Sequence, residues 1–171
     1  MNKKTHQLIN RAFKLLSVSE LNFKELHDAY VRCDQKLMKS GRWNATNPKL
    51  VINKVRETLE EIDLCELEES DRSWCAEILW FWYHHATSCT DWEVHPRLVQ
   101  DYSQKALDYQ QISQPEDKGQ PNRITKLLNL LAYGKLEEAK EWMKVRPDSA
   151  DKVEHQTGLD LIKTYEKYGF I

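Results

Sequence analysis

The sequence predicts an all-α protein built from antiparallel helix pairs, arranged as a compact bundle or a short solenoid. Glycine and proline number only five each in 171 residues, which is few for the tight turns of a mostly β protein. Apolar residues also recur every three or four positions, first over residues 8–16 and then over residues 23–37. This spacing places them on one face of a helix, so both observations favour the same fold class.

The overall composition is that of a folded, water-exposed domain. Hydrophobic residues make up 40% and charged residues 30%, and the formal net charge is −2. That charge predicts no general attraction to nucleic acid or to anionic membrane, although it is compatible with a local basic patch. No apolar run approaches the roughly 18 residues of a membrane span, and no signal peptide is apparent, so we expect a cytoplasmic protein. Its four cysteines should stay reduced there: Cys33, Cys65, Cys75 and Cys89.

The first half of the chain contains five predicted helices. The first covers residues 6–17, and the second is predicted to be capped by Ser19 and to end at Ser40-Gly41. Asn47-Pro48 is a typical helix start and predicts a third helix with apolar positions from residue 50 to residue 62. The most apolar helix is expected at 74–88, where we place the centre of the core. A fifth helix is predicted at 97–110.

A polar segment divides the second half of the chain from the first. Residues 113–122 are rich in Gln, Pro, Asp and Gly, which predicts a linker or an exposed loop. It would join a helical bundle domain at 1–112 to a helical segment at 123–171 that packs on it. The alternative is that both parts belong to one continuous domain. Within the second part, helices are predicted at 124–132, 136–145 and 159–168, with a break at Gly134 and a loop around Pro147.

The C-terminal segment resembles an ankyrin repeat. Residues 125–127 (Thr-Lys-Leu) and 132–139 (Ala-Tyr-Gly-Lys-Leu-Glu-Glu-Ala) follow the pattern of a first helix, a glycine turn and a second helix. A similar start recurs 32 positions later at 157–161 (Thr-Gly-Leu-Asp-Leu), close to the ankyrin period of about 33 residues. The signature Thr-Pro-Leu-His is absent, and Leu128 stands in place of its histidine. The resemblance implies stacked helix pairs that present a binding face.

An acidic stretch and a nearby tryptophan are the candidate partner-binding residues. Eight acidic side chains lie between Glu57 and Asp71, and such a run is either a solvated helix end or a negative patch that attracts a basic partner. Trp43 lies in a Gly-Arg-Trp-Asn loop, where it is either an exposed anchor at an interface or a lid folded onto the core. The predicted partner-binding residues are Trp43, Glu60, Glu61, Glu66, Glu68, Glu69 and Asp71.

The central apolar helix carries the residues with the most chemical potential. His85 and Cys89 are four positions apart and could chelate a metal, with Cys75 or His95 as a further ligand. Core packing is the favoured interpretation, because two potential ligands on one helix are common and no second paired cluster is present, so we predict no metal and no cofactor. His84 or His85 could also act as an acid or base with a carboxylate such as Glu77. No nucleophile motif or glycine-rich phosphate loop accompanies these histidines.

These observations favour a binding role over catalysis. The sequence predicts a non-catalytic protein-binding module. Its partner is expected to be another protein, a basic one if the acidic patch forms the contact, and neither nucleic acid nor membrane. Its most concrete form is a bacterial immunity or antitoxin protein that uses the acidic patch and the helical repeat face. The alternative is a small all-helical enzyme, a hydrolase or a metal-dependent enzyme, that uses His84 and His85.

Overall fold

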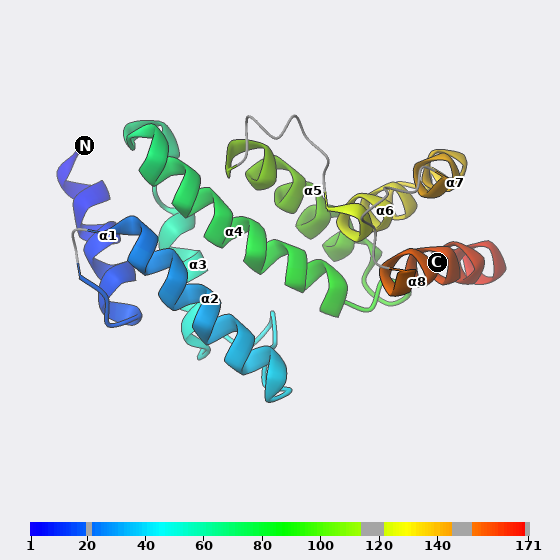
Figure 1. Ribbon diagram of the computed structural model, residues 1–171, viewed down its shortest axis with the longest axis horizontal. Coiled ribbons are helices and arrows are strands. Elements are labelled where there is room, and N and C mark those ends of the chain that lie inside the picture. The colour runs from blue at the N-terminus through cyan, green and yellow to red at the C-terminus, as the bar shows by residue number, and fades with distance from the viewer. Residues whose placement is uncertain (20–21, 114–121, 145–151, 170–171) are drawn as a thin grey trace.

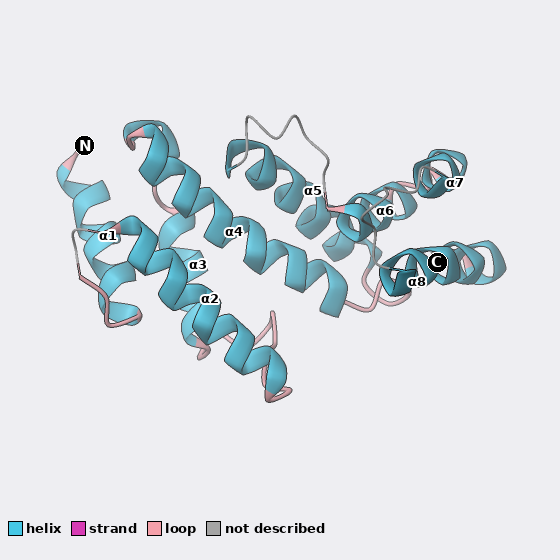
Figure 2. Cartoon of the chain, in the orientation of Figure 1, coloured by secondary structure: helices cyan, strands magenta, loops and turns pink. Residues whose placement is uncertain are grey.

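Every regular element of the described chain is a helix, which confirms the predicted all-α class (Figure 2). The computed structural model describes residues 1–19, 22–113, 122–144 and 152–169. The predicted linker, except for its end residues Ser113 and Asn122, lies outside this range, as does the predicted loop around Pro147. The helices are α1 (Lys3–Leu15), α2 (Phe23–Lys39), α3 (Val51–Glu60), the 3-10 turn η1 (Leu64–Glu66), α4 (Glu69–Cys89), α5 (Pro96–Ser113), α6 (Arg123–Ala132), α7 (Leu136–Lys144) and α8 (Lys152–Tyr168).

The helices form an elongated body with the N-terminus at one end and α7 and α8 at the other (Figure 1). The long helix α4 runs through the middle and packs against α2, α3, α5 and α6. Hydrogen bonds show that α5 and α6 are antiparallel: Gln100 reaches the carbonyl of Ala132, while Gln110 accepts from the backbone N–H of Asn122. The expected packing of antiparallel helix pairs is therefore present at this junction.

Two helix starts differ from the predicted ones. The side chain of Asn22 accepts a hydrogen bond from the N–H of Glu25 at 3.1 Å, so Asn22, and not Ser19, caps α2. The third helix begins at Val51 and not at Pro48. Asn47 instead accepts from the N–H of Lys49 at 3.0 Å, which holds Asn47 and Pro48 in a turn before the helix.

The predicted helix ends at glycine are confirmed. Gly41 and Gly134 both have positive φ angles, +66° and +71°, which glycine adopts without the steric cost of a Cβ atom. The last helix is longer than predicted and begins at Lys152, seven positions before Leu159. Thr157 consequently lies inside α8, whereas Thr125, its counterpart in the ankyrin resemblance, lies in the first turn of α6.

A large core lies among α1–α5, and α4 supplies its centre, as the sequence predicts. Ile78, Leu79 and Trp82 of α4 are at most 1% exposed, and Phe13 of α1 and Leu26 of α2 are equally buried. A smaller core joins α6, α7 and α8. Its buried residues are Leu127, Leu130, Leu131, Ala139, Met143 and Ile162.

No helix in the described part of the chain is long and apolar enough to cross a membrane.

Candidate functional site

Two adjacent histidines of α4 point to different neighbours. His85 places its Nε2 atom 2.9 Å from Oδ2 of Asp34 on α2, whereas His84 places Nδ1 2.6 Å from Oγ1 of Thr125 on α6. Successive residues of an α-helix are turned by about 100° from one another, so the pair contacts two different helices. The histidines therefore link α4 to α2 through His85 and to α6 through His84.

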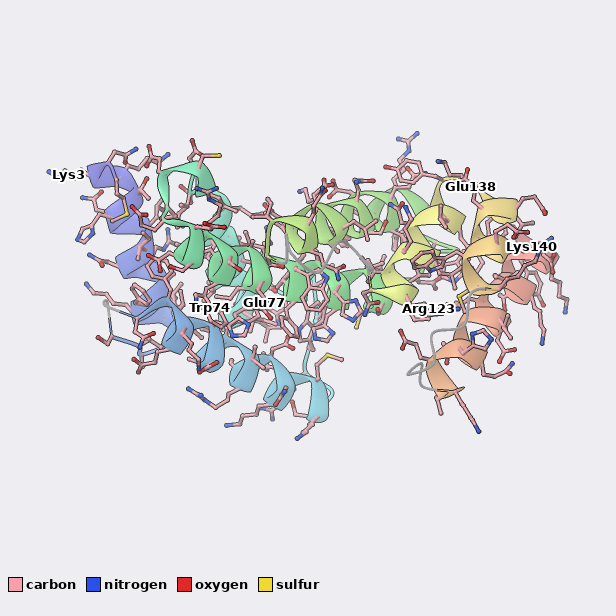
Figure 3. All side chains as sticks on the ribbon, turned by 45° about the horizontal axis from the view of Figure 1, so that its top comes forward. Lys3, Trp74, Glu77, Arg123, Glu138 and Lys140 are labelled. Atoms are coloured by element: carbon pink, nitrogen blue, oxygen red, sulfur yellow. The ribbon has the colours of Figure 1, made fainter. Side chains whose placement is uncertain are left out.

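Glu77 is not the carboxylate partner of these histidines, so that part of the acid–base prediction is wrong. Oε2 of Glu77 lies 3.5 Å from Nε2 of His27 on α2, and the His27 ring packs 4.9 Å from the ring of Trp74. Figure 3 shows Trp74 and Glu77 where α4 meets α2. Glu77 precedes His84 by seven residues, or nearly two helical turns. Because that separation along the helix axis is large, the Glu77 side chain reaches a residue of the neighbouring helix more easily than it reaches His84.

Asp34 is the centre of the most organised polar cluster. Asp34 is only 2% exposed, and its two carboxylate oxygens have different partners. Oδ1 accepts a hydrogen bond from Nε1–H of Trp43 at 2.7 Å, and Oδ2 faces His85. These contacts satisfy a buried acid that would otherwise be costly, and they join the 43–44 loop to α2 and α4.

Trp43 is folded onto the core and is not an exposed anchor. It is 9% exposed, and its ring lies 6.0 Å from Trp82 and 5.8 Å from His85. The lid alternative for this residue is thus the arrangement found. Because Trp43 is tied to Asp34, its ring covers the cluster from the loop side.

The pKa values of His84 and His27 are shifted in opposite directions. Burial, reinforced by the nearby His85, lowers the pKa of His84 to about 4, so His84 is neutral at pH 7. For His27, burial lowers the pKa, but the hydrogen bond and negative charge of Glu77, followed by those of Asp28, outweigh it and raise the pKa overall. His84 thus acts as a neutral hydrogen-bonding group between α4 and α6, and His27 favours its charged form between α2 and α4.

The Asp34–His85 pair has the geometry of an oriented base. A buried carboxylate that contacts one imidazole nitrogen fixes the orientation of the ring, as in enzymes that transfer protons through histidine. The His85 side chain is 20% exposed, so it is within reach of solvent. The ring is therefore held in one orientation at the surface, next to Phe81 and Trp43.

Cys89 is close to this pair in sequence and lies at the exposed end of α4. Burial of its sulfur, followed by the charge of Asp34, raises the pKa of the Cys89 thiol, which disfavours the thiolate needed of a nucleophile or a metal ligand. Among the residues that the structure describes, no group of three or more histidine, cysteine, aspartate or glutamate side chains is placed to hold a metal ion.

The predicted acidic patch is divided by the fold. Glu60 faces inward, where it accepts hydrogen bonds from the Tyr83 hydroxyl and, at 2.7 Å, from Arg56. The Arg56 guanidinium lies 4.4 Å above the ring of Trp82, and Lys105 approaches Glu60 from α5. Glu60 is therefore part of an internal network that joins α3, α4 and α5.

Glu66 also has partners within the molecule. It accepts hydrogen bonds from the Thr5 hydroxyl at 2.6 Å and from the Asn2 amide at 2.7 Å, which attaches η1 to the start of α1. Four other acidic residues of the predicted set have no ion pair in the described part of the chain, and three of these are exposed. The four are Glu61, Glu68, Glu69 and Asp71.

Sequence reasoning missed Asp34 and Thr125, the partners of the two histidines. A signal for Asp34 exists: it lies four positions after Tyr30 and eight after Leu26, on the apolar face of its helix. A charged residue at such a position predicts a buried polar contact. Thr125 carries no comparable signal, because threonine is common at any helix start.

The comparisons with known proteins give no family for this chain. No family model, no curated protein and no solved structure matches it.

Proposed function

We propose that this chain is a protein-binding module without catalytic chemistry of its own, and that a basic partner docks at its acidic end. This end is formed by the end of α3, by η1 and by the start of α4. The observation that carries the proposal is that Glu61, Glu68 and Glu69 are exposed there without ion pairs in the described chain. Unpaired charges of one sign attract an opposite surface and accelerate its encounter.

The electrostatics of Asp71 support this proposal. Partial burial, followed by the charge of Glu68, raises the pKa of the Asp71 carboxyl, so the negative charges of this end repel one another. A cationic partner would relieve that repulsion. Acidic side chains at a helix start also interact favourably with the helix dipole, by about 0.3–1 kcal/mol each, so the end has a role in folding as well.

In its most concrete form the proposal is an immunity or antitoxin role, in which the acidic end covers a basic toxin domain. The captured partner would then harm cells when it is expressed without this chain and be harmless when both are expressed. The helical repeat face of α6–α8, where the ankyrin resemblance lies, would supply the rest of the contact.

A tagged pull-down from the native cell, read by mass spectrometry, tests the proposal. The variant E61K/E68K/E69K should lose a stoichiometric basic partner that the natural chain retains. The matched control E25K/E93K/E154K changes the charge equally at positions with no side-chain ion pair in the described chain. Glu66 is left intact because it holds α1. Retention of the partner by the first variant, with an unchanged on-rate at low salt, would exclude the acidic end as the interface.

The Asp34–His85 pair favours a second candidate, a small hydrolase with His85 as the base. We would measure hydrolysis of an activated ester such as p-nitrophenyl acetate by the natural chain and by His85→Gln. An enzyme should keep its fold in the variant and lose turnover, whereas a binding module should show no turnover that depends on His85. His6→Gln is the control, because His6 is exposed and far along the chain on α1.

A further inference from the structure

The small net charge of the chain hides a strong division between its two parts. Residues 1–56 contain twelve Lys and Arg against four Asp and Glu, a formal charge of +8. Residues 57–171 contain thirteen basic and 23 acidic residues, a formal charge of −10. The net value of −2 therefore says little about either part of the sequence, and the basic residues of the first part have no role in the proposed contact with a basic partner.

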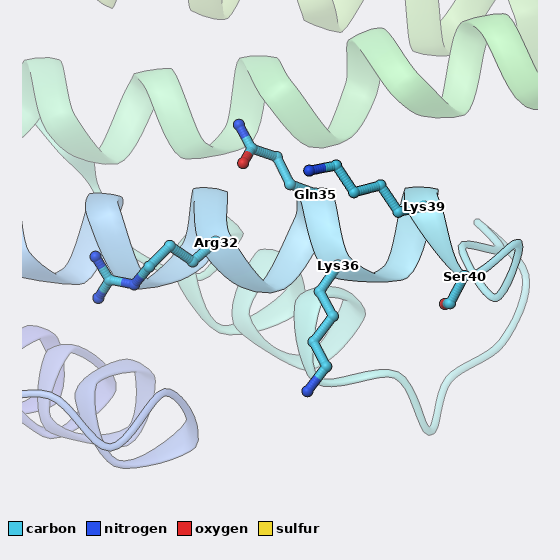
Figure 4. Close-up of a pocket in the computed structure, with 5 residues that line it drawn as sticks. All are labelled: Arg32, Gln35, Lys36, Lys39 and Ser40. Carbon is cyan, nitrogen blue, oxygen red and sulfur yellow. The ribbon is translucent and has the colours of Figure 1, made fainter.

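The C-terminal half of α2 presents a row of unpaired cations. Arg32, Lys36 and Lys39 are separated by four and three residues, so they share one face of the helix. All three are exposed, and none forms an ion pair with the described residues. They line a shallow hollow of about 480 Å³ together with Gln35 and Ser40 (Figure 4).

Helix α1 is basic as well, although the C-terminal half of α2 runs away from it (Figure 1). It contains four Lys or Arg residues and no acidic residue over Lys3–Leu15. A second open hollow, of about 510 Å³, lies on α1 and is lined by Gln7, Asn10, Arg11, Lys14 and Leu15. Two neighbouring helices in the sequence thus each present cations and amide groups to solvent.

The chemistry of the α2 hollow selects its ligand. Lysine, arginine, amide and hydroxyl groups are those that contact the phosphate oxygens of nucleic acids. All five lining residues end in a polar or charged group and none is aromatic, whereas protein interfaces usually centre on buried apolar or aromatic anchors. The aromatic rings of α1 and α2 face the core: Phe13 and Tyr30 are fully buried and Phe23 is half-buried, so no ring is placed to stack on unpaired bases.

We propose that the basic face of α2, formed by Arg32, Gln35, Lys36, Lys39 and Ser40, binds the sugar–phosphate backbone of a nucleic-acid duplex without reading its sequence. The contact is electrostatic, so it weakens steeply with salt. It goes beyond the proposed protein-binding function and is independent of it, because the acidic end contributes none of its residues.

Fluorescence anisotropy with labelled 25-base-pair duplexes, one of DNA and one of RNA, tests the site. If three cations contact phosphates, affinity for the DNA duplex should fall by about fortyfold between 50 and 200 mM salt. The variant R32Q/K36Q/K39Q should bind at least tenfold more weakly at 50 mM salt and lose most of that salt dependence. Glutamine preserves helix propensity, and circular dichroism checks the fold.

The matched control removes three positive charges elsewhere. Arg97, Lys126 and Lys152 have no ion pair within the described residues, and R97Q/K126Q/K152Q should bind as the natural chain does. Equal binding of both duplexes supports recognition of the shared backbone, and a preference identifies the natural source. The proposal is overturned by absence of binding at 50 mM salt or by an equal loss in the control. It is also overturned by poly-L-glutamate competing equally at matched charge, which would favour an acidic protein partner.

Discussion

The large core of α1–α5 and the small core of α6–α8 are stabilised by different kinds of contact. The large core combines aromatic rings with buried polar groups, among them Asp34 with Trp43 and Asn53 with Trp82. The buried members of the small core are all aliphatic, among them Leu127, Leu131 and Met143, and its aromatic rings are only partly buried at its edge. Polar contacts have directions and partners, so they specify which helices pair, whereas aliphatic packing depends mainly on shape.

The junction between the cores combines both kinds of contact. Val99 of α5 packs with Leu128 of α6, while Asn129 donates to the Ser103 hydroxyl at 3.1 Å and His84 bonds to Thr125. Docking of α6 on α4 and α5 thus has both a hydrophobic and a hydrogen-bonded part. We therefore expect the stability of the two cores to respond differently to the loss of a polar group, to the truncation of an apolar side chain and to protonation of a histidine.

Loss of the Asp34 carboxylate should have the largest effect. Asp34→Ala leaves the Trp43 N–H and His85 without their acceptor, and breaking a buried pair costs about 3–5 kcal/mol. Asp34→Asn keeps the volume and one acceptor oxygen and should cost clearly less. Urea unfolding measures both free energies. Equal losses for the two variants would mean that space filling, and not the hydrogen bonds, explains the role of Asp34.

Truncation in the small core should come next. Leu127 is fully buried against α7 and α8, and Leu127→Ala should destabilise the protein by about 3 kcal/mol through lost burial and a cavity. Hydrogen exchange locates the effect. If the cores unfold separately, amides of α7 and α8 should exchange faster while those of α4 keep their protection. Equal acceleration in α4 would show that the two cores unfold as one unit.

Acid should weaken the junction through His84. The folded-state pKa of His84 is about 4 against 6.5 in the unfolded chain, so the unfolded state binds more protons between these values. Stability is therefore lost as the pH falls from 6.5 to 4, by at most about 3 kcal/mol. His27, whose folded-state pKa is raised, acts oppositely: its contribution is complete below pH 6.5 and is lost as the pH rises.

The variant His84→Gln separates this effect from the titration of other groups. It removes the titrating imidazole while keeping a side chain able to bond to Thr125. The stability of the natural chain relative to the variant should fall between pH 6.5 and 4, measured by urea unfolding at each pH. A constant difference across that range would contradict the assigned role of His84.

The sequence predicted the fold class and most helices because these depend on local periodicity. Glycine turns and the apolar spacing of α4 identify elements within one stretch of chain. The site was less predictable, since its pairs join residues far apart: Asp34 with His85, Glu66 with Thr5, and His84 with Thr125. Which carboxylate a histidine meets depends on the relative rotation of packed helices, and the sequence alone does not contain that angle.

The smallest effect, at Gly158 in α8, tests how tightly the small core is packed. A Cβ atom there would lie 2.4 Å from Met143 Cε, 3.1 Å from its Sδ and 3.2 Å from Leu127 Cδ2. Gly158→Ala should gain about 1 kcal/mol of helix propensity and lose slightly more to this overlap, because the end of Met143 is flexible but enclosed. We expect a net destabilisation of about 1 kcal/mol or less. In a Met143→Ala background the main overlap is absent, so the same substitution should become stabilising. Thermal unfolding of the four chains measures this change of sign. If the substitution is stabilising in both backgrounds, the small core tolerates repacking, and its contrast with the polar specificity of the large core would be sharper still. If it is destabilising in both, the overlap with Met143 is not the cause.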